Sequence, residues 1–215
     1  MVPVMGVAFG PMADGVTRRF PHGEVITRQG EDERCLFLVT EGAVRIASVT
    51  PGGREVVVGL LGPGDLFGES ALLGYPSPVQ ARAIGRTEVV ALHVSCIRAI
   101  VERQPGTAEQ LLRLVAGRLH RTRTALEEAL ACDVPGRVAG RLRDLVADHG
   151  VPEAGGVRLG VPVTQDELAR MVGVSRETVN RTVGALAARG LVRSSPRSIV
   201  ITDPEALAAE PRPSA

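Results

Sequence analysis

Hydrophobic and polar positions alternate over short runs in the first half of the chain. Between Phe20 and about Val94, the runs CLFLVTEG, AVRIASV and REVVVGLL are rich in Val, Ile and Leu. Turn signals separate these runs at Glu41-Gly42, Pro51-Gly52-Gly53 and Gly62-Pro63-Gly64-Asp65. Short strands at this spacing are typical of a sandwich or jelly-roll barrel, so we predict a β-rich domain over residues 20–105.

A different pattern follows Ser95. From Thr107 to Ala131 there is no proline and a single glycine, and apolar positions recur at alternating intervals of three and four residues. This heptad spacing is that of a coiled-coil seam, in which Thr122 is the polar member. The predicted seam consists of Leu112, Val115, Leu119, Thr122, Leu126 and Ala129. We expect a helix over residues 106–132 that pairs with its copy in a homodimer; a helix lying on its own domain is the alternative.

The remainder of the chain reads as a smaller domain over residues 133–203. CDVPGR breaks the long helix, and a second helix is expected from Val138 to Val146. HGVPEAGG reads as a loop and VRLGVPV as a strand. Residues 1–19 are expected to be an N-terminal extension, and residues 204–215 a flexible tail.

Two helices separated by a glycine turn are predicted inside this domain. Thr164 followed by Glu167 forms a capping box, and Gly173 supplies the turn. Ser175 is a good N-cap for a second helix that stops at Gly190. Three apolar residues of this second helix are expected to be buried: Val179, Val183 and Leu186. This arrangement, followed by a hairpin-like wing in LVRSSPRSIVIT, predicts a winged helix-turn-helix.

The segment GVSRETVNR places polar side chains on the open faces of the second helix, near its N-terminus. Arg176, Glu177, Asn180 and Arg181 are these residues. Arginine can hold guanine in a fork, glutamate can accept a hydrogen bond from cytosine, and asparagine can read adenine or hold a phosphate. Glu177 and Arg181, four residues apart, are expected to brace one another. Thr164 is expected to contact a phosphate, and Gln165 and Ser175 are further DNA-binding candidates.

Net charge changes this picture little. The chain carries +1 overall, and all 25 of its Lys and Arg residues are arginines. Residues 135–203 contain 10 arginines and 7 acidic residues, a net charge of +3. A duplex needs more positive charge than this average provides, so the arginines must gather on one side.

Other function classes find no support in the sequence. Cys35, Cys96 and Cys132 are far apart and form no CxxC or Cys/His cluster, so no metal site is expected, and free thiols suggest a reducing, cytoplasmic location. No segment is long and apolar enough to span a membrane. The sequence shows no nucleophile–base constellation, phosphate-cradling glycine loop or metal motif, so we do not expect an enzyme.

Two motifs, GDLFGESALLG and then GVSRETVNR, occur in this order and are separated by the expected long helix. In both motifs and in their order, the sequence resembles the cyclic-AMP receptor protein / fumarate–nitrate reductase regulator (CRP/FNR) family. The resemblance runs from about Phe20 to Thr202. It implies an α+β protein with an N-terminal jelly-roll β-barrel like a cyclic-nucleotide-binding domain, a dimerisation helix and a C-terminal winged helix-turn-helix. It also implies double-stranded DNA and RNA polymerase as partners, with Arg176, Glu177 and Arg181 as base-reading positions and Asn180 where family members vary.

The sensor departs from the family pattern. Nucleotide binders of the family carry a glycine–glutamate pair, then an arginine that neutralises the cyclic phosphate; here Gly68-Glu69 is present, but Ser77-Pro78 lies near the expected arginine. The resemblance places these residues in an effector pocket: Gly68, Glu69, Ser70, Ser77, Arg82, Thr122 and Arg123. Loss of a charge-assisted bond costs roughly 1.5–3 kcal/mol, so cyclic AMP binding should be weakened.

Several hypotheses stay open at this point. The main one is a homodimeric transcription regulator that binds a palindromic operator, with an unknown effector. A second is a regulator that responds to cyclic AMP, or to another small effector, through a modified pocket. A third is constitutive DNA binding, and the last is a regulatory subunit that acts on a protein partner through the jelly roll. The loop Val151–Gly160 lies where some family activators touch polymerase.

Overall fold

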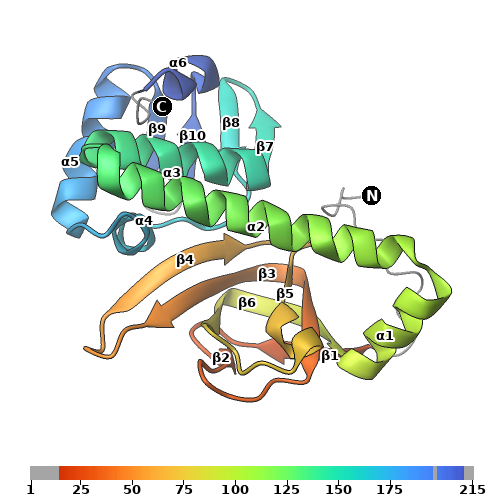
Figure 1. Cartoon of the computed structure of the whole chain (residues 1–215). Helices are drawn as coiled ribbons and strands as arrows, with labels where there is room; N and C mark the ends of the chain where they lie inside the picture. Colours follow the sequence, from red (N-terminus) through yellow and green to blue (C-terminus); the bar gives the residue numbers. More distant parts are fainter. Residues whose placement is uncertain (1–14, 196–197, 211–215) are drawn as a thin grey trace. The chain divides into compact units, whose positions relative to one another are not determined.

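The computed structural model describes residues 15–195 and 198–210, and the chain divides into two compact units after Arg118. The first unit is built mainly of strands and the second mixes helices with a small sheet (Figure 1). The predicted α+β class, with a β-rich N-terminal domain, a long helix and a C-terminal helix-turn-helix, is therefore confirmed.

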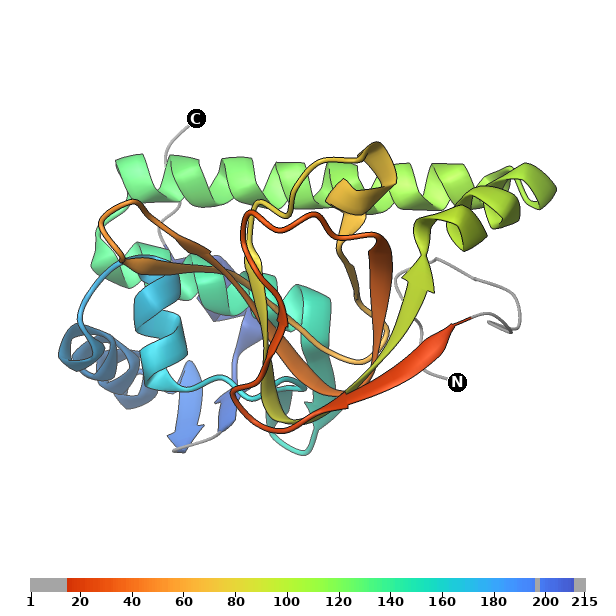
Figure 2. The ribbon, with the colours of Figure 1, turned by 90° about the horizontal axis from the view of Figure 1, so that it is seen from below.

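The first unit is an antiparallel sheet in the order β1-β6-β3-β4, with β2 added to β6 and β5 added to β3. Its elements are β1 (Val16–Phe20), β2 (Val25–Thr27), β3 (Cys35–Val49), β4 (Glu55–Leu61), β5 (Leu66–Phe67), the short 3₁₀ helix η1 (Glu69–Leu73) and β6 (Gln80–His93). The long strands β3 and β6 bend rather than lie flat (Figure 2). Phe37 and Phe67 stack at 4.9 Å between ring centroids in the core, where aromatic pairs bury much apolar area.

The Glu41-Gly42 turn was predicted wrongly, because this dipeptide lies inside the single strand β3. Gly42 has φ +78°, and the register between β3 and β6 shifts on both sides of it. A bulge therefore absorbs the glycine without ending the strand. The sheet also begins upstream of Phe20, because β1 starts at Val16 and pairs with β6. Residues 1–14 of the expected N-terminal extension lie outside the described residues.

Two helices follow the sheet. α1 (Val94–Arg103) was not predicted as an element, although His93 caps it by accepting a hydrogen bond from the Ser95 amide. α2 (Gly106–Ala131) is the predicted long helix. Leu111 and Leu114 near its start pack against the buried cluster that includes Leu66 and Ile97. The beginning of α2 is thus part of the first unit's core.

The second unit combines the end of α2 and four further described helices with a sheet in the order β7-β8-β10-β9. Its elements are α3 (Val134–His149), β7 (Gly150–Glu153), β8 (Gly156–Leu159), α4 (Gln165–Val172), α5 (Arg176–Ala188), β9 (Val192–Ser195), β10 (Ser198–Ile201) and α6 (Pro204–Ala208). The predicted wing is confirmed as the antiparallel pair β9–β10. Leu142, Leu168 and Ile199 are fully buried between these helices and the sheet.

Two expectations for this unit were wrong. HGVPEAGG is not a loop: Gly150–Glu153 is strand β7, which pairs with β8 through a turn at Gly155 and Gly156, both at positive φ. Most residues of β7 are exposed, so no apolar alternation marked it as a strand. The predicted helix at Val138–Val146 is present but longer, as α3.

The segment from Pro204 to Glu210 is folded, so the predicted flexible tail is wrong there. Asp203 caps α6 by accepting a hydrogen bond from the Ala206 amide at 2.8 Å, and Leu207 is only 1% exposed. Glu210 pairs with Arg189 at the end of α5 through both guanidinium nitrogens. A single buried leucine and one ion pair are enough to hold a segment whose composition is that of a tail. Residues 211–215 lie outside the described residues.

Candidate nucleic-acid interface and effector pocket

Local capping signals position the helix-turn-helix. The Thr164 hydroxyl accepts a hydrogen bond from the Glu167 amide at 3.1 Å, so α4 starts where the sequence predicts. Gly173 ends α4 in the left-handed conformation at φ 76°, which favours glycine. The Ser175 hydroxyl then accepts from the Thr178 amide at 3.2 Å and starts α5. Both helix starts are confirmed, and the orientation of α5 follows from them.

One face of α5 is buried and the opposite face is open. Val179, Val183 and Leu186 are at most 2% exposed, as predicted. Thr182 is buried with them and donates its hydroxyl hydrogen to the Thr178 carbonyl at 2.9 Å. This core contact holds the helix so that its polar residues point away from the unit.

The four polar residues of GVSRETVNR are exposed on the open side of α5, namely Arg176, Glu177, Asn180 and Arg181. The expected brace between Glu177 and Arg181 is wrong, since no ion pair of the described residues joins them. The Glu177 carboxylate instead accepts hydrogen bonds at the start of α5. The bond from its own backbone amide, and then the bond from the Ser175 side chain, lower the pKa of the Glu177 carboxyl. The first turn of α5 satisfies this carboxylate and leaves Arg181 open to solvent.

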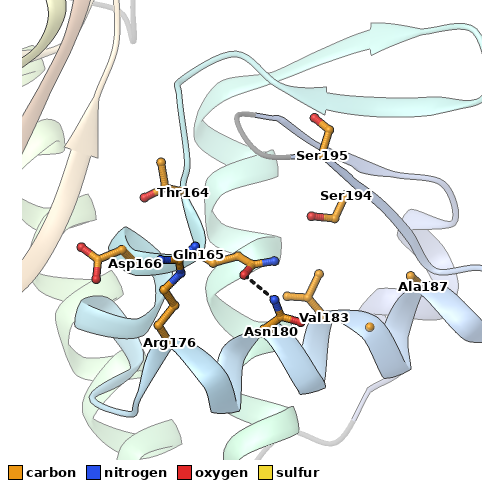
Figure 3. A pocket seen from close by; sticks show the side chains of 10 residues that line it. Thr164, Gln165, Asp166, Arg176, Asn180, Val183, Ala187, Ser194 and Ser195 are labelled. Atoms are coloured by element: carbon orange, nitrogen blue, oxygen red, sulfur yellow. Dashed lines mark hydrogen bonds between the residues drawn. The ribbon is translucent and has the colours of Figure 1, made fainter.

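A pocket of about 690 Å³ lies between the helix-turn-helix and the wing (Figure 3). It is lined by the start of α4, one face of α5 and the end of β9: Thr164, Gln165, Asp166, Arg176, Asn180, Val183, Gly184, Ala187, Ser194 and Ser195. The Asn180 side chain donates a hydrogen bond from Nδ2 to Oε1 of Gln165 at 3.0 Å. Of the predicted site residues, the structure thus brings together Thr164, Gln165, Arg176 and Asn180.

The other predicted site residues border this pocket differently. Ser175, Glu177 and Arg181 do not line it. Ser194 and Ser195 were missed as site residues, although the predicted wing was the signal that could have found them. Gly184 was missed too; a side chain there would meet open space, so this part of α5 leaves room for a ligand.

Comparison with known proteins identifies this architecture. The model of the cyclic nucleotide-binding domain matches residues 17–104, and that of the Crp-like helix-turn-helix domain matches residues 136–210. A "CRP-like cAMP-activated global transcriptional regulator" of Mycobacterium tuberculosis is 38% identical over 195 residues, which cover 90% of this chain and 87% of that protein. The chain belongs to the CRP/FNR family. It is therefore a DNA-binding transcription regulator, and the family to which it belongs is one of regulators and not of enzymes.

Further relatives agree with this assignment. A "Cyclic AMP receptor protein" of Thermus thermophilus is 35% identical over 86% of this chain and 83% of that protein. A solved CRP/FNR-family regulator from the same organism covers 92% of this chain and 100% of its own, with 30% identity and a TM-score of 0.71. The structure of FixK2 from Bradyrhizobium japonicum, at 24% identity and a TM-score of 0.81, shares the fold.

The glycine–glutamate pair of the sensor lies at the start of η1. Gly68 has φ 87°, and a Cβ there would approach the Cys35 carbonyl, so only glycine fits. Glu69 forms an ion pair with Arg118 at 2.6 Å, and Arg118 also donates to the Leu66 carbonyl. This ion pair joins η1 to α2. Arg118 was missed as a site residue, because it lies far from η1 in the sequence.

The remaining pocket candidates of the first unit are also engaged. Ser77 is 5% exposed and donates its hydroxyl hydrogen to the Val79 carbonyl at 2.8 Å. Arg82 on β6 donates to the Gly23 carbonyl at 2.6 Å. Ser70 follows Glu69 in η1. A carboxylate such as that of Glu69 suits ribose hydroxyls, whereas Ser77 offers no guanidinium to a cyclic phosphate.

The two candidates on α2 belong to the second unit. Thr122 and Arg123 are exposed there, and Arg123 pairs with Glu127 at 3.4 Å within the same helix. Nothing in the described residues contradicts a role for them at an effector, and that role stays a prediction.

The predicted seam runs along the exposed side of α2. Leu112, Leu119 and Leu126 are 68%, 69% and 59% exposed, and Val115, Thr122 and Ala129 are exposed as well. Leu130 adds a further exposed leucine. Packing of this stripe on the helix's own domain, the alternative interpretation, is therefore wrong. Large apolar residues at heptad spacing favour a partner helix.

Metal-type residues do not gather in the part of the chain that the structure describes: no group of three His, Cys, Asp or Glu side chains there could hold a metal ion. The three cysteines form no disulfide with one another and are half-buried. Burial, followed by the nearby Glu33, raises the pKa of the Cys35 thiol. Among the described residues, no helix is long and apolar enough to cross a bilayer.

Proposed function

We propose that this regulator acts as a homodimer that reads a palindromic operator with the helix that starts after Ser175. The observation that carries the proposal is the geometry of α5: a capped helix with a buried apolar face and exposed polar residues in its first turns. Such a helix presents its N-terminal residues to base edges in the major groove. Arg176, Glu177, Asn180 and Arg181 are the proposed base contacts, with Thr164, Gln165 and Ser175 at phosphates.

Support for the homodimer comes from the seam on α2. The exposed leucines leave apolar surface in contact with water. A second helix that covered them would stabilise the dimer by roughly 25 cal/mol for each Å² of apolar surface buried. A twofold axis along α2 would present two copies of α5 to half-sites one helical turn apart. We therefore propose three parts: a sensor domain over residues 20–105, a dimerisation helix over 106–132 and a DNA-binding domain over 133–203. Strand β1 extends the sensor upstream to Val16.

The effector is a separate part of the proposal. Relatives named as cyclic-AMP-activated make cyclic AMP a candidate, and Gly68-Glu69 supports it. Ser77 argues against strong binding because its position supplies no charge. Arg118, beside Glu69, is the guanidinium that an entering ligand would meet first. Regulation through a protein partner alone is not favoured, since the two matched domains include a DNA-binding one. RNA polymerase as a partner and a cytoplasmic location stay predictions.

Fluorescence anisotropy tests the proposal. The purified protein is titrated onto a labelled palindromic duplex of family type and onto a scrambled duplex of equal length, with and without cyclic AMP. Binding that prefers the palindrome supports the proposed function, and tightening with cyclic AMP supports the modified pocket. Equal binding to both duplexes would contradict sequence-specific recognition. Sedimentation of the wild type against Leu119→Glu, which places a charge in the seam, tests the dimer.

A further inference from the structure

The hydrogen bond between Gln165 and Asn180 joins the two helices of the helix-turn-helix on their outer side. Gln165 is the first residue of α4 and Asn180 lies one turn after Arg176 on α5. Both side chains are at the rim of the pocket and point toward one another (Figure 3). The bond runs from Asn180 Nδ2 to Gln165 Oε1 at 3.0 Å.

The chemistry of the two amides decides what stays available. An amide nitrogen carries two hydrogens, and its oxygen has two lone pairs. Asn180 uses one hydrogen on Gln165, so its second hydrogen and its Oδ1 form a donor–acceptor edge. This edge matches N7 and N6 of adenine, which asparagine reads in a bidentate manner. Gln165 keeps its own nitrogen as a donor, and that nitrogen suits a phosphate oxygen.

The bond has little value for the fold itself. Asn180 is exposed and Gln165 is partly exposed, so water competes for the hydrogen bond between their side chains. The neighbouring surface leaves room for a base, because Gly184 faces open space and Ser194 and Ser195 carry small side chains. A preformed amide pair would, however, reduce the ordering entropy lost on binding.

We propose that Gln165 is a positioning residue for Asn180, and that Asn180, held in this way, reads an adenine at a base pair separate from those that Arg181 and Glu177 read. The inference rests on the proposed function and deepens it. It makes Asn180 a specificity-determining residue and assigns Gln165 a double role, in which one end of the amide orients Asn180 and the other contacts the backbone.

The experiment is a selection from a duplex library with randomised half-sites, followed by anisotropy on single-base variants of the selected sequence. The wild type is expected to prefer adenine at one base pair by roughly 5- to 150-fold. Asn180→Ala should abolish that preference alone. Gln165→Ala should lower it at the same base pair. Gln165→Glu keeps an acceptor for Asn180, so it should retain the preference while weakening binding to all sequences through phosphate repulsion.

Ala188→Gln is the matched control, since it adds an amide at an exposed position of α5 outside the pocket and leaves the Gln165–Asn180 bond intact. It should shift no base preference. If Asn180→Ala leaves every preference unchanged, Asn180 does not read a base and the inference is overturned. Uniform weakening by Gln165→Ala, with all preferences intact, would overturn its positioning role. A wild type that selects no sequence at all would instead overturn the proposed function, whereas loss of a different base preference in Arg181→Ala would leave the inference standing.

Discussion

The candidate recognition surface and the candidate effector pocket of this protein differ in how far their polar groups already have partners. On α5, Arg176 and Arg181 are exposed, and no ion pair of the described residues holds either of them. In the sensor, Glu69 is paired with Arg118, Ser77 is bonded to Val79, and Arg82 is bonded to Gly23. The two arginines of α5 are open to a ligand, whereas the three sensor side chains already hold partners inside the protein, although Arg82 Nε is buried without one.

This difference in pairing decides how much each sequence motif reveals about its ligand. An exposed arginine gives up only water when it meets a ligand, so the GVSRETVNR motif translates directly into a candidate binding surface. A ligand at Glu69 must instead compete with a guanidinium, and charge-assisted bonds of that kind contribute roughly 1.5–3 kcal/mol. The Gly68-Glu69 motif therefore identifies the sensor domain without identifying its ligand.

Restoring a positive charge in the sensor should give the largest effect. Ser77→Arg places a guanidinium near the family position, and we expect tighter cyclic AMP binding by roughly 1.5–3 kcal/mol, if that single charge is what the pocket lacks. Isothermal titration calorimetry measures this gain. Ser77→Ala, which removes only the bond to Val79, is the control and should gain nothing. Because Ser77 is buried, thermal unfolding of both variants must first show an intact fold.

Removing a charge from the recognition surface should have a similar or slightly smaller effect. Arg181→Ala is expected to weaken binding to the selected operator by roughly 1–3 kcal/mol, because a bidentate base contact is lost. Binding to a scrambled duplex should change much less. Arg98→Ala, an exposed arginine of α1 in the other unit, serves as the control in the same anisotropy assay. An equal loss on both duplexes would mean that Arg181 contacts phosphate and not a base.

A smaller effect, on the free energy of unfolding, is expected from a change beside the buried ion pair of the second unit. Glu128 of α2 is buried, pairs with Arg143 at 3.4 Å and packs directly over Gly140 of α3. Gly140→Ala would press a methyl group onto the Glu128 carboxylate, so we expect a loss of about 1 kcal/mol in unfolding free energy. Chemical denaturation measures it. In a Glu128→Ala background the same change should cost almost nothing, and full additivity would refute the contact.

The smallest expected effect is a pH dependence of stability. Burial, and then the nearby Asp144, raise the pKa of Glu128 above its ordinary value of 4.5, although Arg143 opposes the shift. The folded state therefore binds the proton more tightly than the unfolded state. Its contribution to stability is fully present below pH 4.5 and is lost as pH rises through the raised pKa.

Glu128→Gln should flatten this decline, because an amide does not titrate. Melting temperatures recorded across that pH range for wild type and variant provide the comparison. Part of the slope should persist in the variant, since burial also raises the pKa of Asp144. Glu69→Gln is the control from the sensor, and an equal flattening there would argue against Glu128 as the source.

Elements with strong local signals could be predicted from the sequence. The helix α5 starts after Ser175 and ends near Gly190 because the caps and the apolar stripe lie within a few residues of one another. The exposed seam of α2 follows from its heptad spacing in the same way. Strand β7 and helix α6 were missed because β7 is mostly exposed, and α6 depends on Leu207 and Glu210 meeting distant residues.

The sequence by itself thus determined the fold class, the helix-turn-helix and the residues that α5 exposes. Only the tertiary structure decided how the polar groups are paired, because those pairs join distant segments: Arg118 and Leu66 are 52 residues apart, and Gln165 and Asn180 are 15 apart. Caps and heptads act through backbone geometry over one or two turns, so the local sequence encodes them. An ion pair such as Glu69–Arg118 depends on the fold bringing η1 and α2 within reach of two long side chains, and no local pattern records it.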